Sequence, residues 1–162
     1  MNSLIWQTSP SSTTPPELAV LAQTQSLTRA LKQLDKRFSV QLDYLGLSQT
    51  FPFFKDLSLP ETLFVRNVHL LLNNIAVVAA QSVCLPNSKW CEILNCGTHS
   101  LGSILFSDSL DVQRSGLFFC VQQGKLVRRS WFDYQGERLY LVECFLPDLL
   151  PFLNVVSGSL KE

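Results

Sequence analysis

Apolar and polar residues alternate along six stretches of the chain, and this alternation predicts β-strands. The stretches are residues 38–47, 63–72, 75–85, 111–121, 126–133 and 139–146. Short turn sequences join successive runs at Asn73-Asn74, at residues 122–125 and at residues 134–137, so we expect antiparallel hairpins. Residues 48–60 contain Pro52 and Pro60 and are expected to form a loop.

Three further segments carry helical signals. Residues 17–22 follow Pro16, which suits a first helical turn, and leucines 27, 31 and 34 form one apolar stripe. Residues 100–106 resemble a short helix with Ser100 as N-cap. The pattern predicts an α+β fold with an antiparallel sheet of about six strands, whose helices pack on one face and cover an internal ligand pocket.

The chain is expected to form one domain over residues 17–162. Residues 1–16 precede it as an extended lead-in, because residues 8–16 are rich in Ser, Thr and Pro.

Two charged residues interrupt the apolar faces of predicted strands. Alternate residues of a strand share a face, so Arg66 lies with Val68 and Leu70, and Glu143 lies with Leu141 and Phe145. A charge on an apolar face is costly unless it is paired or binds something. Together, an Arg and a Glu on different strands could hold a small ligand that carries a carboxylate and a hydroxyl at opposite ends.

Structural explanations compete with this ligand site. Arg66 and Glu143 could form a salt bridge with each other, or either could lie near a sheet edge and reach water. Periodicity alone favours these explanations, because structural ion pairs are common.

Composition narrows the class of protein. Hydrophobic residues make up 46% and charged residues 16% of the 162 residues, which is typical of a globular chain with a large core or a closed cavity. The net charge is zero, so nothing global attracts nucleic acid or an anionic membrane. Any anion site must therefore be local.

The cysteines and histidines give no metal or disulfide pattern. The five cysteines lack a C-x-x-C pair, and the two histidines lack metal-ligand spacing, so we expect no metal, no disulfide framework and a reducing cytoplasmic setting. No Lys or Arg precedes Arg29, so a secretion signal is not expected. No apolar run approaches the ~20 residues of a membrane span.

Four ordered motifs resemble the chorismate lyase family, whose bacterial members make 4-hydroxybenzoate. The resemblance covers roughly residues 17–150. The motifs are Ser26-Leu27-Thr28-Arg29, Val65-Arg66-Asn67-Val68-His69-Leu70, His99-Ser100-Leu101-Gly102-Ser103-Ile104-Leu105-Phe106, and Arg128-Arg129-Ser130 followed by Val142-Glu143-Cys144-Phe145-Leu146-Pro147.

The resemblance implies that the protein eliminates pyruvate from chorismate without a cofactor, which is the first step toward the ubiquinone head group. We also expect the product, 4-hydroxybenzoate, to inhibit the enzyme. It implies that Arg66 binds the ring carboxylate and that Glu143 bonds the 4-hydroxyl and could help remove the C4 proton. Leu27 and Leu101 would contribute backbone groups and closure. Independently, Leu101 follows a candidate N-cap, where free N–H groups favour an anion. A monomer is expected.

One position departs from the family pattern. Gln81 stands where relatives carry an Arg that is expected to help hold the second, enolpyruvyl carboxylate. Gln81 can still donate hydrogen bonds but adds no charge, and Arg128 or Arg129 could supply the charge instead. Because of this departure, an alternative interpretation is that the chain is a degenerate lyase that has kept only the binding of aromatic acids. A non-catalytic sensor of the same fold is a further alternative, although nothing in the first 25 residues resembles a DNA-binding helix-turn-helix.

Overall fold

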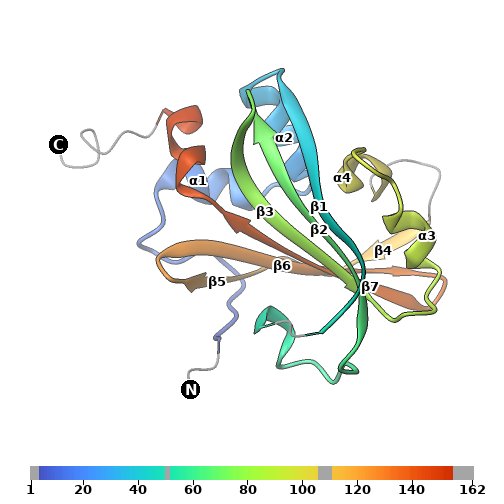
Figure 1. The fold of residues 1–162 in the computed structure, drawn as a ribbon. Coiled ribbons are helices and arrows are strands. Elements are labelled where there is room, and N and C mark those ends of the chain that lie inside the picture. Colours follow the sequence, from blue (N-terminus) through green and yellow to red (C-terminus); the bar gives the residue numbers. More distant parts are fainter. Residues whose placement is uncertain (1–3, 50–51, 106–110, 155–162) are drawn as a thin grey trace.

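A computed structural model describes residues 4–49, 52–105 and 111–154 of the chain. Seven strands form one antiparallel sheet in the order β1-β2-β3-β7-β6-β4, and β5 also pairs with β6 (Figure 1). The strands are β1 (Phe38–Ser48), β2 (Leu63–Leu72), β3 (Ile75–Cys84), β4 (Val112–Arg114), β5 (Phe118–Gln122), β6 (Lys125–Tyr134) and β7 (Glu137–Phe145). The predicted α+β class and antiparallel sheet are confirmed.

The predicted number of strands was wrong by one. The run 111–121 is two strands, β4 and β5, which pair with opposite ends of the same edge of β6. Ser115 lies at the interruption, where its N–H donates to the carbonyl of Trp131 at 2.9 Å and its Oγ accepts from the N–H of Trp131 at 2.8 Å. The run therefore bends at Ser115-Gly116 while both halves keep a partner strand.

Three two-residue turns set the registers of the hairpins. Both central residues of each turn have positive φ, as in Asn73 (49°) and Asn74 (63°), and as in Gln135 (53°) and Gly136 (84°). This conformation matches the twist of antiparallel strands, and Asn and Gly adopt it at low cost. The predicted hairpins are confirmed.

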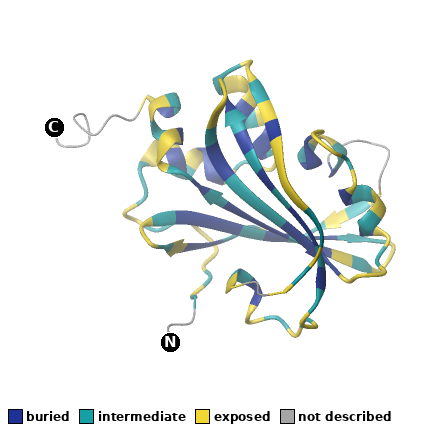
Figure 2. Cartoon of the chain, viewed as in Figure 1, coloured by how far each residue is buried: buried dark blue, intermediate teal, exposed yellow. Residues whose placement is uncertain are grey.

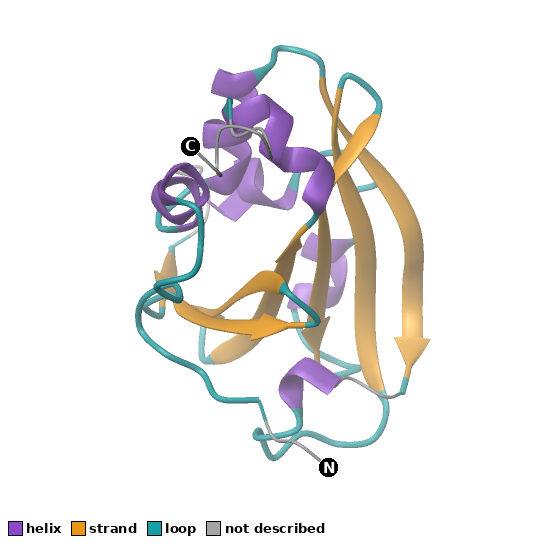
Figure 3. Cartoon of the chain, turned by 90° about the vertical axis from the view of Figure 1, so that its left-hand side faces the viewer, coloured by secondary structure: helices purple, strands orange, loops and turns teal. Residues whose placement is uncertain are grey.

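Most helices gather on one face of the curved sheet (Figure 3). They are α1 (Pro16–Ala22), α2 (Leu27–Leu34), α3 (Trp90–Leu94), α4 (Leu101–Leu105) and the 3-10 helix η2 (Pro147–Leu153). Phe106, at the end of the third predicted helix, lies outside the described residues. Neither α3 nor η2 was predicted.

The opposite face of the sheet is covered by a short 3-10 helix and by residues near the N-terminus. The 3-10 helix η1 (Pro52–Phe54) places Phe54 in a core cluster with valines of β2, β3, β6 and β7. Trp6 packs at the edge of this cluster, and Gln7 forms a β-bridge with Phe119. Burial therefore continues on both sides of the central strands (Figure 2).

Candidate active site

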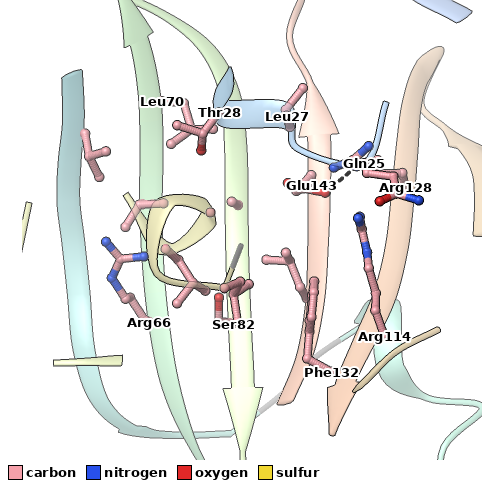
Figure 4. Close-up of a pocket in the computed structure, with 17 residues that line it drawn as sticks. Gln25, Leu27, Thr28, Arg66, Leu70, Ser82, Arg114, Arg128, Phe132 and Glu143 are labelled. Carbon is pink, nitrogen blue, oxygen red and sulfur yellow. Dashed lines mark hydrogen bonds and ion pairs between the residues drawn. The ribbon is translucent and has the colours of Figure 1, made fainter. Parts of the chain in front are cut away.

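A small cavity lies between the helix-covered face of the sheet and the helices α2 and α4 (Figure 4). Its volume is about 40 Å³, which holds only a few water molecules. Its lining combines aliphatic side chains with four charged ones: Arg66 from β2, Arg114 from β4, Arg128 from β6 and Glu143 from β7. The strands thus bring together residues that are distant in the sequence.

Arg66 is 2% exposed and has no carboxylate partner among the described residues. Its Nη2 donates to the carbonyls of Gly97, at 3.2 Å, and His99, at 2.9 Å, while its buried Nε has no hydrogen-bond partner within residues 4–49, 52–105 and 111–154. Burial lowers the pKa of Arg66 from its usual value, because the buried cation has lost the water that would stabilise its charge. The side chain is therefore oriented by two backbone carbonyls.

Glu143 pairs with Arg128, and not with Arg66 as one of the structural explanations proposed. Arg128 Nε donates to Glu143 Oε1 at 2.5 Å, and the two side chains are 2% and 7% exposed. Arg128 Nη1 also donates to the carbonyls of Ala22 and Thr24, at 2.8 and 2.7 Å. Arg128 thus joins the connection between α1 and α2 to the carboxylate, and neither Arg66 nor Glu143 reaches solvent at a sheet edge.

Leu27 and Leu101, the two predicted apolar residues, lie where α2 and α4 begin, and both line the cavity. Ser100 precedes α4, and its Oγ accepts from the N–H of Ser103 at 3.0 Å, so the predicted N-cap is confirmed. The two helices meet where Thr28 contacts Gly102. A Cβ on Gly102 would lie 2.5 Å from Thr28 Oγ1, so only glycine allows this approach.

Gln81, which the sequence offered as one possible contact for the second carboxylate, does not line this cavity. Its Nε2 donates to Asn67 Oδ1 at 3.0 Å on the other face of the sheet. The cause is a shift in the β2–β3 register: Leu72 pairs with Ile75, but Arg66 pairs with Ser82. A regular hairpin would pair Arg66 with Gln81 on one face, and one extra residue in β3 moves Gln81 to the other.

Arg129 also points away from the cavity. It makes bonds of 2.6 and 2.8 Å to the carboxylate of Asp56 and lies over the ring of Trp6. Its hydrogen bonds to Asp56 lower the pKa of that carboxyl below its usual value. Arg129 therefore holds the loop and the N-terminal segment on the second face.

Arg114 is a cavity residue that the sequence analysis missed. It lies over the ring of Phe132, with 5.3 Å between the guanidinium carbon and the ring centroid. Burial, followed by the positive charge of Arg128, lowers the pKa of Arg114 to about 10. The signal in the sequence was weak, because Arg114 ends a three-residue strand that carries no clear alternation.

Among the described residues, no group of three His, Cys, Asp or Glu side chains could hold a metal ion. None of the described helices is long and apolar enough to cross a membrane. The absence of a metal or cofactor remains a prediction from the sequence.

The model of the chorismate lyase family matches residues 1–152. The chain belongs to the chorismate lyase family. The resemblance inferred from the four motifs is thereby confirmed.

Relatives in several bacteria share this membership. A protein of Pseudomonas syringae pv. syringae is 35% identical, with 83% of this chain and 82% of the relative covered. A protein of Idiomarina loihiensis is 32% identical, and the match covers 82% of this chain and 83% of the relative. A protein of Nitrosospira multiformis is 29% identical, and the match covers 90% of this chain and 94% of the relative. All three are named "Probable chorismate pyruvate-lyase".

Among solved structures, one match is a possible transcriptional regulator, YydK, of Bacillus subtilis. It is 12% identical with a TM-score of 0.46, and the match covers 69% of this chain and 59% of the regulator.

Proposed function

We propose that this chorismate lyase family member converts chorismate into 4-hydroxybenzoate and pyruvate without a cofactor. The observation that carries the proposal is that a buried Glu143 lines the same cavity as a buried Arg66, which has no carboxylate partner in the part of the chain that the structure describes. The names of the bacterial relatives support the same reaction. The product would serve as the head-group precursor of ubiquinone.

Arg66 is proposed to bind the ring carboxylate of chorismate. A guanidinium matches a carboxylate in charge and planar geometry, and Nε of Arg66 lacks a hydrogen-bond partner among the residues that the structure describes. An anion at this position would also compensate the burial that lowers the pKa of Arg66. Binding energy is therefore available here that the ligand-free protein does not use.

Glu143 is proposed to accept a hydrogen bond from the 4-hydroxyl. It lies on β7, two strands from Arg66 on β2, so the two backbones are about 10 Å apart. Side chains that reach inward from both strands would contact substituents at opposite ends of a six-membered ring bound between them. Arg128 holds Oε1 of Glu143, which leaves Oε2 for the ligand.

The reaction requires little from the protein. The bond between C3 and the ether oxygen breaks, C4 loses a proton, and the released enolpyruvate gains a proton at its methylene carbon to become pyruvate. Formation of the aromatic ring drives the elimination, and atoms balance without an oxidant or reductant. Glu143 is placed to assist removal of the C4 proton, because it contacts the hydroxyl on the same carbon. The site then has to orient the dianion and exclude water.

The small cavity indicates that the ligand-binding state differs from the ligand-free one. A ring with two carboxylates does not fit into about 40 Å³, so α2 and α4 must separate or cavity side chains must move. Once bound, the product would be enclosed, and we expect product inhibition. We further expect a monomer that acts in the cytoplasm.

The proposal is tested with purified protein treated with a chelator and incubated with chorismate. Pyruvate is followed by a coupled dehydrogenase assay and 4-hydroxybenzoate by absorbance, with equal amounts expected. Samples without protein and samples of Arg66→Ala serve as controls. If high protein concentrations release no pyruvate while 4-hydroxybenzoate still binds, the protein is an aromatic-acid binding protein and not a lyase.

A further inference from the structure

We propose that Arg128 is a positioning residue, which aims Glu143 at the 4-hydroxyl and couples that contact to the closure of α2 over the cavity. This inference rests on the function proposed above. It gives Arg128 a role other than binding the second carboxylate, which the sequence left open. The region concerned is the end of the cavity away from Arg66, where Arg128, Glu143 and Gln25 lie together (Figure 4).

The sheet places the side chain of Arg128 beside Glu143. The two residues are direct partners in the register of β6 and β7, and both line the cavity. Arg128 Nε donates to Glu143 Oε1 at 2.5 Å, and the side chains are only 2% and 7% exposed. Charge-assisted bonds of this kind have narrow geometry, so the bond fixes the plane of the carboxylate and the direction of Oε2.

The same guanidinium holds the connection between α1 and α2. Arg128 Nη1 donates to the carbonyl of Ala22, the last residue of α1, at 2.8 Å, and to the carbonyl of Thr24 at 2.7 Å. The last carbonyls of a helix lack partners within the helix and carry partial negative charge, which makes a cation a favourable partner. Ser26, the N-cap of α2, follows only two residues after Thr24, so these bonds fix where α2 begins.

The start of α2 is a wall of the cavity. Leu27 and Thr28 line it, and Thr28 contacts Gly102 of α4. Arg128 stays with the sheet, because β6 pairs with β5 on one side of it and with β7 on the other. If α2 moves outward to admit a ligand, the two carbonyls move away from Arg128. The complete set of bonds around the guanidinium therefore exists only in the closed state, in which Glu143 is also held.

The carboxylate end of the site is built separately. Arg66 is oriented by the carbonyls of Gly97 and His99, which belong to the loop before α4. No hydrogen bond or ion pair links Arg66 to Arg128 within the described residues. A change at Arg128 should therefore affect recognition of the hydroxyl much more than recognition of the ring carboxylate.

The test compares the binding of 4-hydroxybenzoate and benzoate to the unchanged protein, Arg128→Gln and Arg128→Lys by calorimetry. Benzoate lacks the hydroxyl, so the ratio of the two dissociation constants reports the contact with Glu143. General losses of folded protein or of binding to Arg66 cancel in this ratio. We expect Arg128→Gln to lower the preference for 4-hydroxybenzoate at least about fivefold, because Oε2 is no longer aimed. Arg128→Lys should keep part of the preference, since it keeps the charge but not the planar fork.

A paired variant keeps the test decisive where Arg128→Gln does not fold. Arg128→Gln combined with Glu143→Gln removes both charges of the buried pair, so no charge is left uncompensated there. If Arg128 acts through Glu143, the combined variant should match the ligand preference of Glu143→Gln alone to within about twofold. A larger difference would show that Arg128 acts on the hydroxyl by another route and would overturn the positioning role.

Arg129→Gln is the matched control, since Arg129 is bonded to Asp56 on the other face, and it should leave the ratio unchanged. An undiminished preference in Arg128→Gln and Arg128→Lys would overturn the role of Arg128 alone. Equal weakening of both acids in Arg128→Gln would do the same, because it would show a merely structural role. If the unchanged protein has no preference, the proposed hydroxyl contact of Glu143 is itself wrong, and the role of Arg128 falls with it.

Discussion

Arg128 and Arg129 are neighbours on β6, yet they point to opposite faces of the sheet and belong to different environments. Arg128 is 2% exposed beside a cavity and pairs with a buried carboxylate. Arg129 pairs with Asp56, whose side chain is 48% exposed, and lies over the ring of Trp6. On the second face, charge fastens a loop and the N-terminal segment onto an apolar cluster.

The cavity face uses charge differently. It buries Arg66 without a carboxylate partner among the described residues, and it buries the Arg128–Glu143 pair beside the same cavity. Such an arrangement is costly for folding alone, because desolvation of each charge must be offset. The proposed function accounts for this difference between the faces, because it assigns a substrate carboxylate to Arg66 and a substrate hydroxyl to Glu143.

The largest expected effect is the loss of activity in Arg66→Ala. The ring carboxylate would lose two charge-assisted bonds of about 1.5–3 kcal/mol each, so kcat/KM should fall about 10²- to 10⁴-fold. The free energy of unfolding of the ligand-free protein should change by less than about 1 kcal/mol, because removal of an uncompensated buried cation offsets the lost bonds to two carbonyls. Initial rates and thermal unfolding measure the two quantities. Near-normal kcat/KM would remove Arg66 from the ring carboxylate.

The second prediction compares the neighbouring arginines directly by stability. Arg128→Gln leaves Glu143 buried without its ion-pair partner and should lower the free energy of unfolding by about 3–5 kcal/mol. Arg129→Gln breaks a pair with an exposed carboxylate and should cost about 1 kcal/mol or less. Denaturant unfolding of both variants gives these values. Similar losses for the two would mean that the faces do not differ as described.

The third prediction concerns the contact between α2 and α4. Gly102→Ala places a methyl group 2.5 Å from Thr28 Oγ1, so the helices must separate, at a cost of about 1–3 kcal/mol. Because these helices cover the cavity, 4-hydroxybenzoate should also bind more weakly in calorimetry. Adding Thr28→Ala should restore part of both losses, since the nearest atom is removed. Strict additivity of the two substitutions would show that the contact does not carry the effect.

The smallest effect is expected for Gln81→Arg. An arginine at this position would lie on the second face, so KM for chorismate should change less than about twofold in initial-rate assays. A large fall in KM would show that the side chain reaches the substrate after all.

The Gln81 position also shows how far the sequence predicts this molecule. Period-2 alternation and the turn residues Asn73-Asn74 predict β2 and β3 with nearly their observed bounds. They do not reveal the extra residue in β3, because a bulge leaves the apolar pattern of both strands almost intact. Once the register shifts by one residue, the face of every later residue in β3 changes.

Two further features depend on tertiary contacts. Arg66 and Glu143 could be selected because each breaks an apolar face, whereas the Arg128–Glu143 pair requires knowledge of which strands are neighbours. The helix α3 has five residues, too few for a helical repeat to be recognised, and Trp90 is held by its Nε1 bond to the carbonyl of Glu137. Short elements fixed by distant partners leave little trace in local sequence.

Binding of 4-hydroxybenzoate and benzoate tests most directly whether the cavity face is built for a ligand with a carboxylate and a hydroxyl. Calorimetry at one temperature compares the two acids with the unchanged protein, Arg66→Ala and Glu143→Ala. We predict that the unchanged protein binds 4-hydroxybenzoate at least about tenfold more tightly than benzoate, that Glu143→Ala removes this preference, and that Arg66→Ala weakens both ligands. Equal affinities for the two acids in the unchanged protein, or a preference that survives Glu143→Ala, would contradict the account.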